Sequence, residues 1–390
     1  MLNSVQKSVR AESQISGAVF VTGMLLCSAL ACHTDTTDST SRDDRLTEAE
    51  VLQSQIERLR EETGAPGIVV AVAEGGGAPL VAATGYADIQ RKIPLRPETP
   101  FLIGSISKNV FAAITLQLVE EGLLGLDDPL SAYLEWPRGD EITIRMLMNH
   151  TSGIPDYFTA LSLLSSQEGV PEFFSGRHPP SEIIEMMPSR DPTFDPGTLQ
   201  RYSNTNGLLV GQVIEMVTGE SLGEVFDERI VSRLGLENTF LYDEMTIDRP
   251  RARGYSGLPG WVSSPGQLLD CSFADEALPN SADGSIVSSA VDLLRYHQAL
   301  RGGKLLSDAS WETMRRVEPG LDNGLGYLIM KGPLGDHEGN VGRAIGHLSA
   351  SVYYLERDLF VVMMLNQGDV QLPMRRFLEM RYGEIAKPIG

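Results

Sequence analysis

The sequence has few cysteines, few basic residues and no recognisable metal or nucleotide motif, and each shortage excludes a class of protein. Three of its 390 residues are cysteine, which excludes a disulfide-dense scaffold. The chain has no H-E-x-x-H, no paired C-x-x-C and no G-x-G-x-x-G after a strand, the spacings typical of zinc and dinucleotide sites. Lys and Arg number 32 against 52 Asp and Glu, a net charge of −20, which repels phosphate backbones. We therefore expect no metal, no cofactor and no nucleic-acid partner.

An apolar run over residues 15–31 follows Lys7 and Arg10 and is too short for a comfortable membrane span. It ends on Ala-Leu-Ala, a signal-peptidase pattern, directly before Cys32. The tetrapeptide Ala-Leu-Ala-Cys also resembles a bacterial lipobox, although leucine is usual three residues before the cysteine. Both interpretations predict a signal peptide over residues 1–31, and the lipobox adds a lipid anchor on Cys32. We expect an exported bacterial protein, either a membrane-anchored lipoprotein or a periplasmic or secreted protein.

Residues 32–45 are polar and contain no aromatic side chain, which predicts a disordered tether. The folded domain is expected over residues 46–390. Cys271 is its single cysteine, so an internal disulfide is excluded despite the expected export.

A predicted helix that begins with a serine and a lysine is the first candidate for a functional site. Residues 106–119 are apolar on nearly every side of a helical wheel, which is typical of a helix buried in a larger core. Ser105 and Lys108 occupy its first turn, three residues apart and so on one face. Burial favours the neutral form of an amine, and a neutral amine beside a hydroxyl is a general base beside a nucleophile. The unpaired N–H groups at the helix start suit an oxyanion.

This helix alone leaves alternatives open. Ser105 has the chemistry of a helix N-cap, and Lys108 has a stem long enough to carry its amine to solvent. The same S-x-x-K spacing occurs at Ser4 and Lys7, within the expected signal peptide, so the spacing is not specific by itself.

Other polar residues lie outside this helix. His150 and Ser152 lie in a polar turn and invite a catalytic-triad interpretation, but side chains that cap local backbone are the simpler one. His297 is predicted to be a surface residue on a helix, and His337 to lie in a turn. Helical period is present at residues 46–63, 207–217 and 290–300. Period-two alternation predicts short strands at residues 327–330, 344–347, 352–355 and 360–365.

Three motifs follow one another along the chain: Ser105-x-x-Lys108, Tyr202-x-Asn204 and Gly346-His347. This ordered set resembles the serine β-lactamase and penicillin-binding superfamily. The likeness is greatest to the branch of class C β-lactamases, D-alanyl-D-alanine carboxypeptidases and related esterases. No single motif is specific, but their order and separations together are. The resemblance covers residues 46–366 and includes short matches at residues 67–73, 85–88, 150–153, 196–197 and 282–284.

The resemblance implies a role for each matching residue. Ser105 would attack a carbonyl carbon and become acylated. Lys108 and the Tyr202 hydroxyl would move the protons of acylation and of acyl-enzyme hydrolysis. Asn204 would hold the Lys108 amine and the substrate amide. The backbone N–H groups of Ser105 and Ala350 would form the oxyanion hole.

The third motif departs from the family pattern, which is Lys-Thr-Gly in β-lactamases and often His-x-Gly in peptidase and esterase relatives. Here the chain reads His347-Leu348-Ser349. A histidine gives this substrate-binding position a charge that varies with pH near neutrality. Ser349 would place a side chain where the substrate backbone passes the strand, and the loop that follows is several residues shorter than in the family. These departures favour a peptidase or esterase over an efficient β-lactamase.

The expected fold is α+β and β-lactamase/transpeptidase-like, an antiparallel sheet flanked by helices with a mostly helical inserted region. Residues 46–126 and 283–390 are expected to build the sheet region and residues 127–282 the insert, with the site at their junction. The expected function is that of an exported serine hydrolase working through an acyl-enzyme, a D-alanyl-D-alanine carboxypeptidase-like peptidase or esterase. A β-lactamase and a non-hydrolytic penicillin-binding or sensor module are the alternatives. The expected partners are a small-molecule or peptide substrate and, only through a lipid on Cys32, a membrane.

Overall fold

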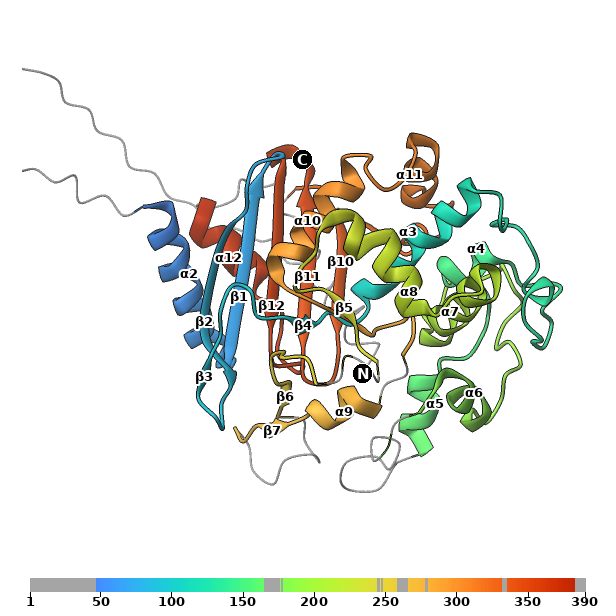
Figure 1. The fold of residues 1–390 in the computed structure, drawn as a ribbon, viewed down its shortest axis with the longest axis horizontal. Helices are drawn as coiled ribbons and strands as arrows, with labels where there is room; N and C mark the ends of the chain where they lie inside the picture. The colour runs from blue at the N-terminus through green and yellow to red at the C-terminus, as the bar shows by residue number, and fades with distance from the viewer. Residues whose placement is uncertain are drawn as a thin grey trace, which may run out of the picture.

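An antiparallel sheet covered by helices on both faces forms the body of the molecule (Figure 1). The computed structural model describes residues 47–164, 176, 178–243, 246, 248–257, 266–277, 280–331 and 335–382. The expected signal peptide and the tether lie outside these residues. Within them, no helix combines the length and the apolar character needed to cross a membrane.

The main sheet has seven strands and joins two distant parts of the chain. All its strand pairs are antiparallel, and β1 pairs with β12 at its centre. The expected antiparallel α+β fold is confirmed. The exact limits of the two sheet-forming parts and of the insert stay a prediction. From one edge to the other the strands are β3 (Ile93–Pro94), β2 (Leu80–Asp88), β1 (Gly67–Glu74), β12 (Leu359–Leu365), β11 (Leu348–Tyr354), β10 (His337–Arg343) and β9 (Leu328–Met330).

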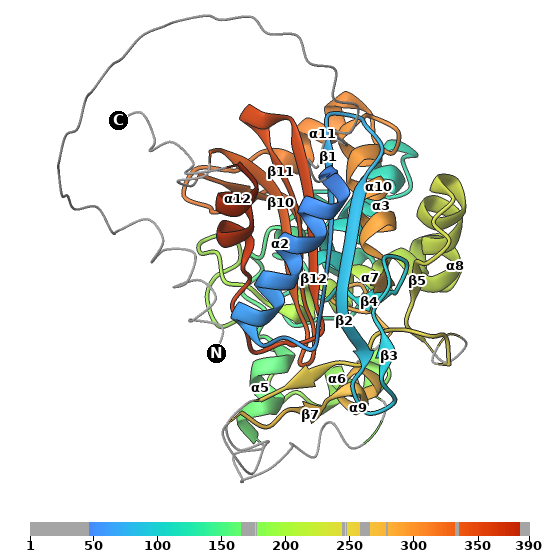
Figure 2. The ribbon, with the colours of Figure 1, turned by 90° about the vertical axis from the view of Figure 1, so that its left-hand side faces the viewer.

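The central strands are buried on both faces, so their sequences are almost continuously apolar. In β1, Ile68 and Val70 pack into a cluster with helices α2 (Glu48–Thr63) and α12 (Met374–Tyr382), whereas Val69 and Ala71 pack into the larger core on the opposite face. Figure 2 shows α2 and α12 lying together over one face of the sheet. The sheet therefore separates two apolar layers.

Local signals set the limits of α2. Thr47 and Glu50 form a reciprocal capping box at its start, which satisfies backbone N–H groups that a helix leaves unpaired. Gly64 ends it in the left-handed conformation, with φ of 71°. The helix expected over residues 46–63 is confirmed.

Helix α3 (Ile106–Glu120) runs through the larger core and is the helix expected to be buried. The helices that surround it or extend the same half are α4 (Ile144–Met148), α5 (Tyr157–Leu164), α6 (Pro180–Met186), α7 (Asn204–Thr218), α8 (Leu222–Phe226), α9 (Ser272–Ala277), α10 (Ala290–Arg301) and α11 (Asp308–Arg315). Short helical turns are η1 (Leu130–Ala132), η3 (Asp227–Ser232) and η4 (Leu355–Arg357). Short strands are β4 (Phe101–Leu102), β5 (Phe240–Leu241), β6 (Tyr255–Ser256), β7 (Leu269–Asp270) and β8 (Ile286–Ser288).

Three sequence-based predictions for the last third of the chain are wrong. Residues 344–347 form the tight turn between β10 and β11 rather than a strand, because the Ala344 N–H donates to the His347 carbonyl and closes a hairpin. His337 begins β10 instead of lying in a turn. His297 is buried, not exposed, because its side of α10 packs on β11 and β12.

Candidate active site

Ser105 stands at the start of α3, but it does not cap the helix. Its side chain makes no capping hydrogen bond. Its Oγ lies 2.6 Å from the Tyr202 phenolic oxygen and 3.4 Å from Lys108 Nζ. The N-cap alternative is therefore excluded by the direction of the hydroxyl. The same helix start carries the partial positive charge of the helix dipole, which favours an anion beside Ser105.

The Lys108 amine has three oxygen neighbours. It donates to Asn204 Oδ1 at 2.9 Å and to the Asp283 carbonyl at 2.5 Å, and Ser105 Oγ is the third. An amide oxygen and a carbonyl oxygen only accept hydrogen bonds, so both require an N–H from the amine. The remaining tetrahedral position faces Ser105, and it is an N–H in the ammonium form or a lone pair in the neutral form. Proton exchange by Lys108 is thereby directed at the Ser105 hydroxyl.

Tyr202 and Asn204 reach this point from the start of α7. Asn204 is the first residue of the helix and Tyr202 lies two residues before it. The Asn204 backbone N–H donates to Asp156 Oδ1 at 2.7 Å, which fixes the first turn. Asn204 Oδ1 also accepts from the Tyr202 hydroxyl at 3.3 Å. With its proton directed there, the phenolic oxygen is free to accept a hydrogen bond from the Ser105 hydroxyl across 2.6 Å.

The Asp283 carbonyl is positioned by a buried carboxyl group. Tyr157 donates to Asp283 Oδ2 at 2.9 Å, and Ser281 donates to Asp283 Oδ1. Burial, with the nearby Asp283 charge, raises the pKa of the Tyr157 phenol well above its ordinary value, so Tyr157 stays a hydrogen-bond donor. Asp283 thus contributes a main-chain oxygen to Lys108 while its side chain is held from behind.

The second half of β10, beyond the residues that pair with β9, approaches the chain that precedes Ser105. A Cβ added at Gly104 would lie 2.9 Å from the Arg343 nitrogen, and one added at Gly342 would collide with the Ile103 carbonyl. The hairpin bond between Ala344 and His347 makes Arg343 and Leu348 a non-hydrogen-bonded pair, because such pairs alternate along an antiparallel ladder. The Arg343 N–H therefore points away from β11, toward the backbone that carries Ser105.

The structure does not bring the three predicted residues of the third motif to Ser105 as substrate groups. Ala350 lies in β11, an interior strand, and its N–H is directed into the ladder with Met363 of β12. Ser349 Oγ donates to the Ile103 carbonyl at 2.8 Å, so it holds the chain that precedes Ser105. In this geometry the Ala350 N–H is directed at β12, whereas the backbone of Arg343 lies next to Gly104, so Arg343 is the candidate donor in its place.

His347 lies in a separate buried cluster. Its Nε2 is 3.4 Å from Asp275 Oδ2, and Arg251 approaches the same carboxyl at 3.6 Å. Its ring meets Phe101 edge to face, with centroids 6.0 Å apart. His347 is 1% exposed and so has no surface for a substrate.

Sequence reasoning missed the Asp283 carbonyl, the Arg343 N–H and the contacts of His150. A main-chain group leaves no side-chain signature, so the first two had only indirect signals. These were the match at residues 282–284 and the two glycines of β10, which mark a close approach of backbones.

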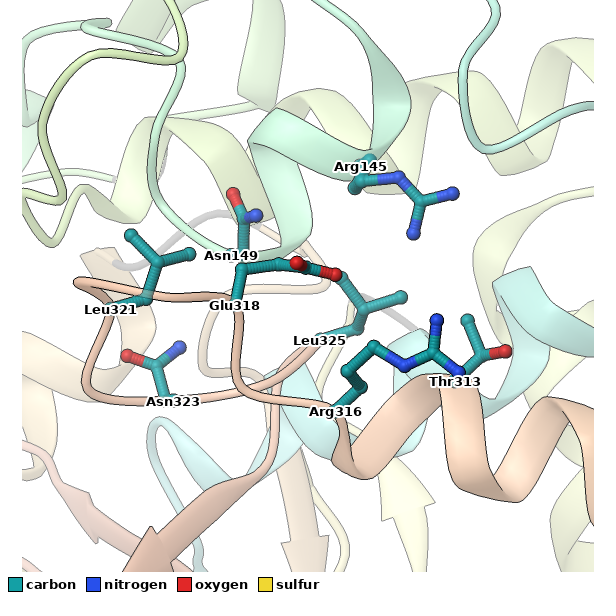
Figure 3. A pocket seen from close by; sticks show the side chains of 8 residues that line it. All are labelled: Arg145, Asn149, Thr313, Arg316, Glu318, Leu321, Asn323 and Leu325. Atoms are coloured by element: carbon teal, nitrogen blue, oxygen red, sulfur yellow. The ribbon is translucent and has the colours of Figure 1, made fainter.

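Among the residues that the structure describes, no group of three or more His, Cys, Asp and Glu side chains is arranged to hold a metal ion. Figure 3 shows a small pocket between the end of α4 and the chain that follows α11, lined by Arg145, Asn149 and Arg316 among others. None of the residues that contact Ser105 line it. The candidate active site is therefore assigned from the geometry around Ser105.

Comparison with known proteins gives relatives in sequence and in structure. A penicillin-binding protein of Bacillus subtilis is 28% identical over 76% of this chain and 65% of its own length. A D-aminopeptidase of Brucella anthropi is 33% identical over 53% of this chain and 38% of its own length. The chain thus spans less than two thirds of each of these relatives. The solved D-amino acid amidase of Ochrobactrum anthropi, complexed with D-phenylalanine, superposes with a TM-score of 0.72 at 25% identity, over 85% of this chain and 97% of the amidase.

A family model matches most of the chain. Residues 52–380 match the family model described as Beta-lactamase, and this range contains Ser105, Lys108, Tyr202 and Asn204. The resemblance drawn from the three motifs is thereby confirmed, and the chain belongs to the Beta-lactamase family.

Proposed function

We propose that this protein is an exported serine hydrolase that forms an acyl-enzyme on Ser105 and acts on amides or esters of D-amino acids. The observation that carries the proposal is the position of Ser105 Oγ, 2.6 Å from the Tyr202 oxygen and 3.4 Å from Lys108 Nζ. A hydroxyl held between two proton-transfer groups at the start of a buried helix is an activated nucleophile.

Acylation begins when Ser105 Oγ bonds to the carbonyl carbon of the substrate. Its proton passes to the lone pair of the neutral Lys108 amine, 3.4 Å away. The carbonyl oxygen becomes an oxyanion, which the N–H groups of Ser105 and Arg343 stabilise together with the helix dipole of α3. The bond to the leaving group then breaks, the Tyr202 hydroxyl gives its proton to that group, and the protonated Lys108 returns a proton to Tyr202.

Deacylation repeats these steps with water as the nucleophile. Lys108 takes a proton from the water as its oxygen bonds to the acyl carbon. The Ser105 oxygen then leaves and recovers a proton from the neighbouring Tyr202 hydroxyl, which Lys108 reprotonates. Asn204 keeps the Lys108 amine in one place throughout, because its side-chain oxygen accepts from Nζ at 2.9 Å. The residues of the chain supply every proton transfer in this sequence.

The names of the relatives support the D-amino-acid part of the proposal. One sequence relative is a D-aminopeptidase and one structural relative is a D-amino acid amidase. Staphylococcus aureus has a further relative, a teichoic acid D-alanine hydrolase, 30% identical over 48% of this chain.

The test uses enantiomer pairs of D- and L-alanine p-nitroanilide and of the matching methyl esters. The proposal predicts faster turnover of the D forms by the wild-type protein and loss of that turnover in Ser105→Ala. Unchanged turnover in Ser105→Ala, measured on protein with a native circular dichroism spectrum, would contradict it. Equal turnover of the D and L forms would be consistent with Ser105 as the nucleophile but would refute the preference for D-amino-acid substrates.

A penicillin-binding protein that stays acylated is the second candidate, favoured by the B. subtilis relative. A fluorescent penicillin separates the outcomes. A stable mass addition on Ser105 without release supports this binding or sensor role. Rapid release, with turnover of a chromogenic cephalosporin, supports a β-lactamase.

The exported location is a proposal that rests on residues outside the described part of the chain. Expression with Cys32→Ser tests the lipid anchor. The anchor predicts that the wild-type protein fractionates with membranes and that the variant does not. A soluble wild-type protein lacking residues 1–31 supports simple secretion instead.

A further inference from the structure

His150 contacts the chain on both sides of Tyr202. Its backbone carbonyl accepts from the Arg201 N–H at 2.9 Å, and its ring Nδ1 accepts from the Ser203 N–H at 3.3 Å. The two residues that flank Tyr202 are therefore bound by one histidine. The His150 ring also packs on the Tyr202 ring, with centroids 4.5 Å apart and planes tilted by 39°.

The backbone of His150 is held in a conformation suited to this contact. It has φ of 63° just after α4, in the left-handed region that few residues other than glycine adopt. The Thr151 N–H donates to the Met146 carbonyl at 2.9 Å and closes the end of the helix. The left-handed residue turns the chain so that the carbonyl and the ring of His150 both face residues 201–203.

The orientation of the His150 ring is set by a neighbour on α7. Ser152 Oγ and Asn206 Oδ1 are joined at 2.7 Å, which leaves the Asn206 Nδ2 to donate to His150 Nδ1 at 3.2 Å. Nδ1 then faces two donors, Asn206 Nδ2 and the Ser203 N–H, so it carries no proton. The ring is the neutral tautomer with its proton on Nε2.

Electrostatics agree with this tautomer. Burial, with a smaller contribution from the Lys108 charge, lowers the pKa of His150 to about 3. A neutral ring next to the amine avoids a second positive charge beside Ser105.

We propose that His150 is a positioning residue, which fixes the Tyr202 phenol against Ser105 Oγ by binding both of its neighbours and packing on its ring. The inference rests on the proposed function, and it gives a role to a polar turn that the sequence alone explains more simply as local capping. His150 does not touch the nucleophile, so its effect on the reaction passes through Tyr202.

A double-mutant cycle between His150 and Tyr202 tests the proposal. In His150→Asn an amide oxygen replaces Nδ1 and the left-handed backbone remains accessible, but the ring that packs on Tyr202 is lost. We expect the kcat for D-alanine p-nitroanilide to fall by about tenfold or more with little change in KM, since a misplaced proton-transfer group slows the chemical step. In a Tyr202→Phe background the same change should cause almost no further fall.

A second variant tests the proposal even if His150→Asn does not fold. Asn206→Ser leaves His150 in place and removes the amide that orients its ring, and its smaller loss of kcat should also disappear in the Tyr202→Phe background. His297→Asn is the matched control. His297 is another buried neutral histidine, but its ring contacts Ser351 and Tyr327, so we expect it to lower stability without changing kcat.

The outcomes separate the two proposals. Wild-type turnover that falls in Tyr202→Phe establishes the hydrolase, and additive effects of His150→Asn and Tyr202→Phe would then overturn the positioning role alone. An unchanged kcat in His150→Asn would overturn it as well. Absence of any wild-type turnover would overturn both proposals.

Discussion

Asn204 Oδ1 accepts a hydrogen bond from Lys108 Nζ at 2.9 Å. Together with the Asp283 carbonyl at 2.5 Å, this bond occupies two of the positions around the amine. The position that remains faces the Ser105 hydroxyl, so the contact between an asparagine and a lysine determines where the proton of the nucleophile goes.

The first prediction concerns this contact. Asn204→Leu removes one of the two fixed acceptors and lets the Lys108 amine rotate away from Ser105. We expect kcat to fall by about 10²–10³-fold with a smaller change in KM. Steady-state kinetics with D-alanine methyl ester measures the effect, and thermal unfolding checks the fold. A kcat within twofold of wild type would refute the assigned role of Asn204.

A second prediction concerns the approach of β10 to the nucleophile. Gly342→Ala adds a Cβ that collides with the Ile103 carbonyl and lies 2.8 Å from Ser349 Oγ, so the strand and the start of α3 are pushed apart. We expect the free energy of unfolding to fall by about 1–3 kcal/mol. We also expect ester turnover to fall, because the site itself is displaced. Gly76→Ala is the control, because no atom lies within 4 Å of its added Cβ. Wild-type turnover in Gly342→Ala would show that β10 does not build the site.

The third prediction is that the buried His347 stabilises the fold and does not bind substrate. Asp275→Ala leaves the Arg251 charge buried without its carboxyl partner and should lower the free energy of unfolding by about 3–5 kcal/mol. His347→Phe keeps an aromatic contact with Phe101 and should leave KM unchanged. Denaturant unfolding and steady-state kinetics measure the two effects. A large rise of KM in His347→Phe would restore the substrate-binding role that the sequence predicted.

The fourth prediction concerns pH. Burial lowers the pKa of His150 and of His297 to about 3, against about 6.5 in the unfolded chain. Between these values the unfolded state binds more protons, so stability rises with pH. The full stabilisation is present above pH 6.5 and is lost as the pH falls toward 3, by about 2 kcal/mol per histidine at pH 5.

Urea unfolding at pH 7.5 and pH 5 checks this dependence. The window lies above the range in which most carboxylates titrate, so the two histidines dominate the change. His297→Asn should reduce the fall of the free energy of unfolding by about half. Equal stabilities of the wild-type protein at the two pH values would contradict the burial of both rings as neutral groups.

Sequence reasoning predicted the site side chains that lie close together in the sequence. Ser105 and Lys108 are one helical turn apart, which their spacing predicts, whereas Tyr202 and Asn204 were assigned from the order of the three motifs and the family resemblance. The apolar surface of α3 on all sides also predicted its burial. These features depend on residues close together in the sequence, so they can be predicted without knowing the tertiary structure.

The features that sequence reasoning missed depend on contacts between distant segments. The chain of β10 is rich in glycine and lacks strand alternation, because its glycines are needed where backbones meet, as at Gly342 and Ile103. Sequence reasoning therefore predicted no strand over residues 337–343, where the structure has β10. The burial of His297 also could not be read from its helix, since the face that packs on β12 is decided by the sheet.

The measurement that tests the central claim most directly is peptide mapping of the protein after reaction with a fluorophosphonate probe. The account predicts one adduct on Ser105, slower labelling in Lys108→Met and in Tyr202→Phe, and none in Ser105→Ala. An adduct on another residue, or equal labelling of all four proteins, would contradict it.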